Sequence, residues 1–156
     1  MIADRNRFLP CLLSGLGIFA LMVGCGGPTG DRPDVGEVTG VVKMDGVPLA
    51  NASVTFQPSS GRPSRGVTNE EGQYELMYVR DDPGAKTGDH SVMISTYRSA
   101  DPDAEDGPVQ AMAETVPAQY NVKSGLKANV KAGENEINFD LESKGEIIDP
   151  EKYDGR

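Results

Sequence analysis

Residues 36–58 read GEVTGVVKMDGVPLANASVTFQP, and apolar and polar side chains alternate along this stretch. Its first half places an apolar or small side chain at every second position, and side chains two apart point to the same face of a β-strand. Asp45 and Gly46 then supply the positive φ angles that a tight hairpin turn needs. The second half alternates again until Pro58, which has no N–H to donate to a neighbouring strand. The positions expected on the buried face are Val38, Gly40, Val42, Met44, Ala52, Val54 and Phe56.

The same period of two recurs along the chain at short intervals. Further strands are expected at residues 65–68, 73–79, 89–97, 126–131 and 137–142. The segment 89–97 carries apolar side chains on both faces, which is typical of a central strand. Seven strands with one apolar face each can bury those faces only against one another. The sequence therefore predicts an all-β fold, a seven-stranded antiparallel β-sandwich, in preference to a closed barrel. Residues 109–116 are expected to form a turn or two of helix.

The amino-terminal residues have the build of a secretory signal. Arg5 and Arg7 form a short basic segment, and a mostly apolar run follows from Leu9 to Val23. A helix that spans a membrane needs about 20 apolar residues. The run here is shorter and carries Pro10 near its start, so a cleaved leader of residues 1–24 is favoured over an uncleaved anchor.

Residues 21–25, LMVGC, resemble the lipobox of bacterial lipoproteins, although Met22 stands where that family most often has Leu. The resemblance implies cleavage between Gly24 and Cys25. It also implies that Cys25 carries a diacylglyceryl thioether and that its new amino group is acylated, for example with palmitate. Several acyl chains exceed the two signals that stable membrane anchoring requires. Gly26 rather than Asp follows the Cys, and the sorting rule known for some lipoproteins then favours the outer membrane of the cell envelope.

The cysteine content and the net charge exclude two further features, an intramolecular disulfide and nucleic-acid binding. Cys11 lies in the leader, so Cys25 would be the one remaining thiol and no intramolecular disulfide could form. Residues 25–35 lack an apolar pattern and are expected to be a flexible tether. The leader holds two of the 15 basic and one of the 24 acidic side chains, which leaves a net charge near −10. Such a surface repels phosphate backbones, and nucleic acid is therefore excluded as a partner.

Several stretches, taken in order, resemble the carboxypeptidase regulatory-like domains, the transthyretin-like sandwich modules of many bacterial surface lipoproteins. They are residues 36–58, 68–76, 83–94, 117–120 and 124–130. The match covers residues 36–142, and the charged tail 143–156 is expected to fray or to add an edge strand. The resemblance implies a transthyretin-like fold without catalysis, in an accessory, adhesive or spacer role. Fold alone does not fix function.

No residue set nominates a catalytic, cofactor or metal site. His90 is the one histidine, whereas the iron sites of related sandwich enzymes need two His and two Tyr. We expect it to be a side chain at the start of a strand with ordinary titration. Residues 61–66 have the wrong spacing for a nucleophile elbow. The expected protein is a non-enzymatic module without a cofactor, whose partners are the lipid bilayer through Cys25 and other envelope proteins or polysaccharide.

Three alternatives stay open at this point. The segment 99–116 contains Asp101, Asp103, Glu105 and Asp106, which form either a solvated acidic loop or a weak calcium site. A carbohydrate-binding module would need exposed aromatic side chains, and the chain has five Tyr and no Trp. A hydrolase whose triad meets only in space ranks last, because nothing in the sequence nominates its members.

Overall fold

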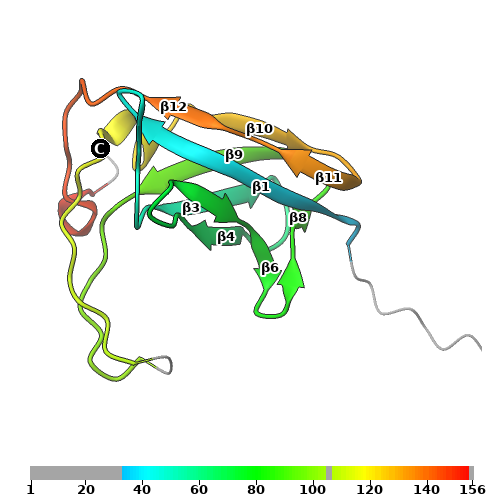
Figure 1. Cartoon of the computed structure of the whole chain (residues 1–156), viewed down its shortest axis with the longest axis horizontal. Coiled ribbons are helices and arrows are strands. Elements are labelled where there is room, and N and C mark those ends of the chain that lie inside the picture. The colour runs from blue at the N-terminus through cyan, green and yellow to red at the C-terminus, as the bar shows by residue number, and fades with distance from the viewer. Residues whose placement is uncertain (1–32, 105–106, 155–156) are drawn as a thin grey trace, which may run out of the picture. The chain divides into compact units, whose positions relative to one another are not determined.

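The chain folds as a β-sandwich of two sheets in the computed structural model, which describes residues 33–104 and 107–154 (Figure 1). The all-β sandwich expected from the sequence is confirmed. Within the described residues, helical structure is limited to two short 3-10 turns, η1 (Ala118–Tyr120) and η2 (Pro150–Lys152). None of the helices in this part of the chain is long and apolar enough to cross a membrane.

The first sheet is built around β1 (Val35–Met44), the longest strand. Three short strands pair with β1 in the antiparallel sense, and two pair with it in parallel, one following the other along its length. The antiparallel strands are β2 (Val47–Pro48), β5 (Gln73–Glu75) and β8 (Ala85–Lys86). The parallel strands are β11 (Gly133–Glu136) and β12 (Phe139–Leu141).

The second sheet is antiparallel throughout its described strands. Its order is β10 (Lys127–Val130), β9 (Gly88–Ser95), β3 (Ser53–Pro58), β4 (Ser64–Val67), β6 (Met77–Val79) and β7 (Asp82–Pro83). β9 lies between β10 and β3, which confirms the central strand predicted at residues 89–97.

The core lies between the sheets and consists of the side chains that the alternation predicted. Val38 and Val42 from β1 meet Val54 and Phe56 from β3, and all four are fully buried. The rings of Phe56 and Phe139 contact each other edge to face across the two sheets, with centroids 6.1 Å apart. The hairpin turn is also confirmed, because Asp45 and Gly46 have φ angles of 50° and 82°.

Two features differ from the predicted wholly antiparallel, seven-stranded arrangement. The predicted strand 137–142 is present as the shorter β12, a further strand, β11, precedes it, and both run parallel to β1. A parallel pair requires a long connection, and here almost the whole domain supplies it. The predicted strand 73–79 is divided at Leu76, where the chain leaves β1 in one sheet and joins β4 in the other. Leu76 is fully buried, and its N–H donates to the carbonyl of Val38 over 2.9 Å.

A long arm leaves the sandwich after β9, and the helix expected at residues 109–116 is not there. We call residues 97–114 the arm, of which 105 and 106 lie outside the described part. Its two segments run side by side (Figure 1), joined by bridges between Arg98 and Met112 and between Asp101 and Val109. Pairing with the outgoing segment overrides the helical propensity of the Ala and Met residues in the returning one.

The charged tail does not fray across its described residues, 143–154. The N–H of Ala118, which begins η1, donates to the carbonyl of Glu146 over 2.8 Å. Lys123 and Glu146 form an ion pair at 3.3 Å. The carboxylate of Asp149 accepts from the N–H of Glu151 and begins η2. The tail is thus held against the domain, because its backbone and side chains satisfy groups near η1.

Candidate functional site

The lipid-attachment and cleavage residues predicted from the sequence lie outside the described part of the chain. Gly24 and Cys25 belong to residues 1–32, as do the leader and most of the tether 25–35. The cleavage and acylation of this segment therefore stay predictions. The described residues form a hollow that the sequence analysis did not predict.

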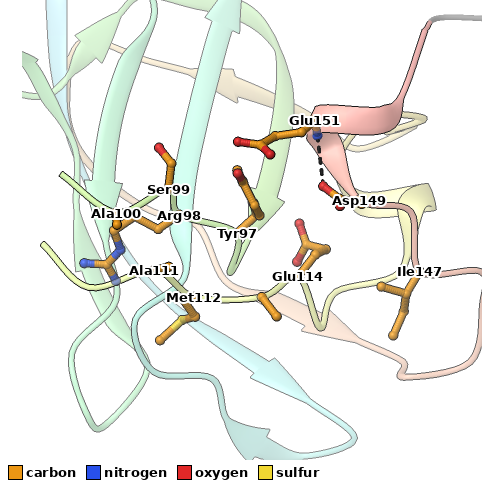
Figure 2. A pocket seen from close by; sticks show the side chains of 11 residues that line it. Tyr97, Arg98, Ser99, Ala100, Ala111, Met112, Glu114, Ile147, Asp149 and Glu151 are labelled. Atoms are coloured by element: carbon orange, nitrogen blue, oxygen red, sulfur yellow. Dashed lines mark hydrogen bonds between the residues drawn. The ribbon is translucent and has the colours of Figure 1, made fainter.

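This hollow, of about 610 Å³, lies between the base of the arm and the tail (Figure 2). Both segments of the arm line it, and the tail closes one side. Its lining residues are Tyr97, Arg98, Ser99, Ala100, Ala111, Met112, Ala113, Glu114, Ile147, Asp149 and Glu151.

Glu114 fixes the geometry at the base of the arm. Its Oε1 accepts hydrogen bonds from the backbone N–H groups of Thr96, at 3.0 Å, and Val116, at 2.9 Å. The Thr96 hydroxyl also donates to Oε1, and the Ser95 hydroxyl donates to Oε2 over 2.5 Å. Thr96 is buried, so these bonds join the end of β9 to the returning segment of the arm.

The tail brings two further carboxylates to the same hollow. Asp149 pairs with Lys152 at 3.0 Å, and its hydrogen bond with Lys152 is the main reason why its pKa lies below the usual value. The pKa of Tyr97 is raised to about 12, chiefly by hydrogen bonding with Glu151 and then by desolvation. Tyr97 is therefore a neutral phenol at physiological pH. The hollow thus combines an aromatic ring with three acidic side chains.

The arrangement favours binding of positively charged or hydrogen-bond-donating groups. A carboxylate only accepts hydrogen bonds, and Arg98 is the one basic side chain that lines the hollow. Figure 2 shows the Arg98 guanidinium directed away from Glu114, Asp149 and Glu151. The rest of the lining is largely apolar.

His90 does not titrate ordinarily, which corrects the expectation from the sequence. Its side chain is buried beside Phe56, with ring centroids 5.7 Å apart. One ring nitrogen, Nδ1, lies 3.0 Å from the carbonyl of Gly88, and the other, Nε2, is buried without a partner in the described structure. Burial lowers the pKa of His90 because the charged form loses its hydration. His90 is a core side chain at the start of β9.

The structure describes only some of the residues considered for calcium and sugar binding. Within residues 33–104 and 107–154, no three His, Cys, Asp or Glu side chains are placed to hold a metal ion. Asp101 and Asp103 lie on the arm, whereas Glu105 and Asp106 are outside the described part. Of the five Tyr, Tyr74 is buried and donates its hydroxyl to the carbonyl of Ile137 over 2.6 Å, so it cannot belong to an exposed sugar platform.

Sequence reasoning missed the hollow because its parts are far apart in the chain. The returning segment of the arm was expected to be helical and the tail to fray, and either outcome would have dispersed Glu114, Asp149 and Glu151. One signal was present in the sequence: Ile147 and Ile148 interrupt an otherwise charged tail. Apolar residues in an otherwise charged tail indicate that the tail packs against the folded domain.

Comparisons with known proteins add no family. No family model matches the chain, and no curated protein matches it. Among solved structures, the chain is similar to a 9R-lipoxygenase from Cyanothece PCC8801, with 18% sequence identity and a TM-score of 0.39. The similarity covers 72% of this chain and 17% of the lipoxygenase, so the chain spans about a sixth of that enzyme's length. At this TM-score the likeness supports no inference about fold or activity.

Proposed function

We propose that the chain is a lipid-anchored protein of the bacterial cell envelope, whose β-sandwich has a non-catalytic binding or structural role. The observation that carries the proposal is the basic and apolar leader that ends in LMVGC at Cys25. An acylated Cys25 would hold the protein on a membrane, because each buried CH₂ contributes about 0.8 kcal/mol.

The fold is compatible with this arrangement. β1 begins at Val35, and the described core cluster is built from side chains between Val38 and Leu141. That range lies within residues 36–142, the extent proposed for a carboxypeptidase regulatory-like domain of transthyretin-like fold. Residues 25–35 would then separate the anchor from the domain. Gly26 favours the outer membrane as the final location.

Metabolic labelling with an alkyne analogue of palmitate tests the anchor. The full chain is produced in a bacterium that acylates lipoproteins, and the label is detected after purification. We expect labelling of the natural chain and none of Cys25→Ala. Cys11→Ala is the matched control, since that thiol lies in the leader and its loss should leave labelling intact. Equal labelling of natural chain and Cys25→Ala, or none of either, would contradict the proposal.

A further inference from the structure

We propose that the hollow between the arm and the tail binds a basic side chain of a partner polypeptide, an ammonium or guanidinium group on an aliphatic stem. This inference goes beyond a general binding role and does not depend on the lipid anchor. It follows from the apolar part of the hollow, its charge and the position of Tyr97.

The apolar part of the lining suits an aliphatic stem. Ala100, Ala111 and Ala113 are exposed, and Met112 lies beside them on the returning segment of the arm. Ile147 presents 53% of its surface to solvent although the tail is held in place at Glu146 and Asp149. Lys and Arg side chains lay their methylene groups along surfaces of this kind and keep the charged end at a polar rim.

The acidic part of the lining selects a cation as the charged end. Three carboxylates and one basic side chain line the hollow, which leaves an excess of negative charge there. The basic side chain, Arg98, points away from the carboxylates (Figure 2). Lys152 pairs with Asp149, whereas Glu114 and Glu151 have no ion-pair partner within the described residues. Glu114 is held instead by neutral hydroxyl and N–H donors. A cation entering here gains attraction without first displacing another cation from these two carboxylates.

The aromatic ring of Tyr97 offers a cation–π contact, which a neutral ligand could not form. Its side chain lies between the arm and the tail, with Glu151 on one side and Glu114 on the other (Figure 2). Its ring lies near the Glu151 carboxylate, within the hollow. The face of an aromatic ring attracts ammonium and guanidinium groups through its quadrupole. The same surroundings repel anions, and the net charge of −9 on the whole chain favours the approach of a basic segment.

The test uses three short capped peptides and the purified full chain. The probes are acetylated and amidated Gly-Lys-Gly and Gly-Arg-Gly, with Gly-norleucine-Gly as the neutral counterpart of similar length. Two-dimensional NMR follows the amide signals during titration. We expect saturable shifts confined to residues near 97–100, 111–114 and 147–151 with the two basic peptides, and none with norleucine.

Variants separate the hollow from general attraction to an acidic protein. Glu151→Gln removes one charge at an exposed position, and we expect it to weaken binding about tenfold, as loss of a charge-assisted contact does. Glu134→Gln removes the same charge from exposed β11, away from the hollow, and should leave the affinity unchanged. Tyr97→Phe should retain more affinity than Tyr97→Leu because it keeps the ring. Circular dichroism checks that each variant is folded.

Three outcomes would overturn the inference. One is a set of shifts scattered over the surface, with Glu134→Gln as weak as Glu151→Gln, which would indicate attraction to net charge alone. Another is an equal response to norleucine. The third is a lack of saturable binding by either basic peptide at tens of millimolar while the chain remains folded.

Discussion

Gly40 lies at a point in β1 where the sheet leaves no room for a side chain. A Cβ at this position would overlap the carbonyl oxygen of Ile137 and lie 2.9 Å from the ring of Tyr74. The same carbonyl accepts the hydrogen bond of the Tyr74 hydroxyl, so neither neighbour can move without losing that bond. The close approach of β1 to the chain between β11 and β12 therefore depends on glycine.

We expect Gly40→Ala to lower the free energy of unfolding by about 3 kcal/mol, because overpacking a closely packed site forces backbone shifts. Urea denaturation measures the change. Gly125→Ala is the matched control, since a Cβ there meets no atom within 4 Å and the φ angle is not in the positive region. Equal stability of the two variants would show that the sheet is looser at Gly40 than described.

His90 predicts a pH dependence of stability. Burial holds its folded pKa below the ordinary value of 6.5, while Asp89 and Lys86 act in opposite directions on it. Below pH 6.5 the unfolded chain thus binds more protons at this residue than the folded chain, and stability falls as the pH is lowered through that window. Urea denaturation at pH 7 and pH 5 should show this loss, and His90→Phe should show a smaller one.

The natural chain and His90→Phe contain the same Asp and Glu side chains. The contribution of these carboxylates to the pH dependence of stability is therefore the same in both proteins, and the difference between them reports on His90. An identical pH dependence for His90→Phe and the natural chain would mean that His90 is solvated in the folded protein.

Among the elements, the base of the arm is held to the end of β9 by the Glu114 carboxylate together with backbone hydrogen bonds across the arm. Glu114 accepts hydrogen bonds from Ser95 and Thr96 at the end of β9 and from Thr115 and Val116 on its own segment. The Thr96 hydroxyl in turn accepts a hydrogen bond from the Thr115 N–H over 2.8 Å. These contacts order the arm before any ligand is considered, which is why Glu151 rather than Glu114 is the residue to change in a binding test.

We expect Glu114→Ala to lower the free energy of unfolding by about 2 kcal/mol, since it leaves buried donors at Thr96 without their acceptor. Hydrogen exchange should also quicken at Arg98 and Met112, whose backbone groups bond each other across the arm. Glu134→Ala on exposed β11 serves as the control, with little expected change. Unchanged exchange at Arg98 in Glu114→Ala would mean that the arm is ordered by other contacts.

The elements also show how far sequence reasoning reaches. Period-two alternation correctly predicted that Val38, Val42 and Phe56 lie in the core. Successive side chains of a strand point to opposite faces, so the buried face can be identified from neighbouring residues alone. The turn at Asp45 and Gly46 was also predicted correctly, because it depends only on the residues that form it. The change of sheet at Leu76 and the parallel pairing of β11 with β1 were missed, because they depend on which distant strand offers a free edge. The hollow was missed for the same reason.

In the whole molecule, a predicted lipid anchor precedes the described β-sandwich domain. The strands of the sandwich lie between Val35 and Leu141, and the arm and the tail line an acidic hollow. The described core cluster is built from side chains between Val38 and Leu141. We propose that the leader and Cys25 determine location and that the hollow determines recognition, and the Cys25→Ala and Glu151→Gln variants test these two proposals separately.

Intact-mass and tandem mass spectrometry of the chain, purified from a bacterium that acylates lipoproteins, tests whether Cys25 is the acylated amino terminus. We expect an amino terminus at Cys25, with a diacylglyceryl group on sulfur and an acyl group on nitrogen. A mass that still includes residues 1–24, or a Cys25 with an unmodified thiol, would contradict it.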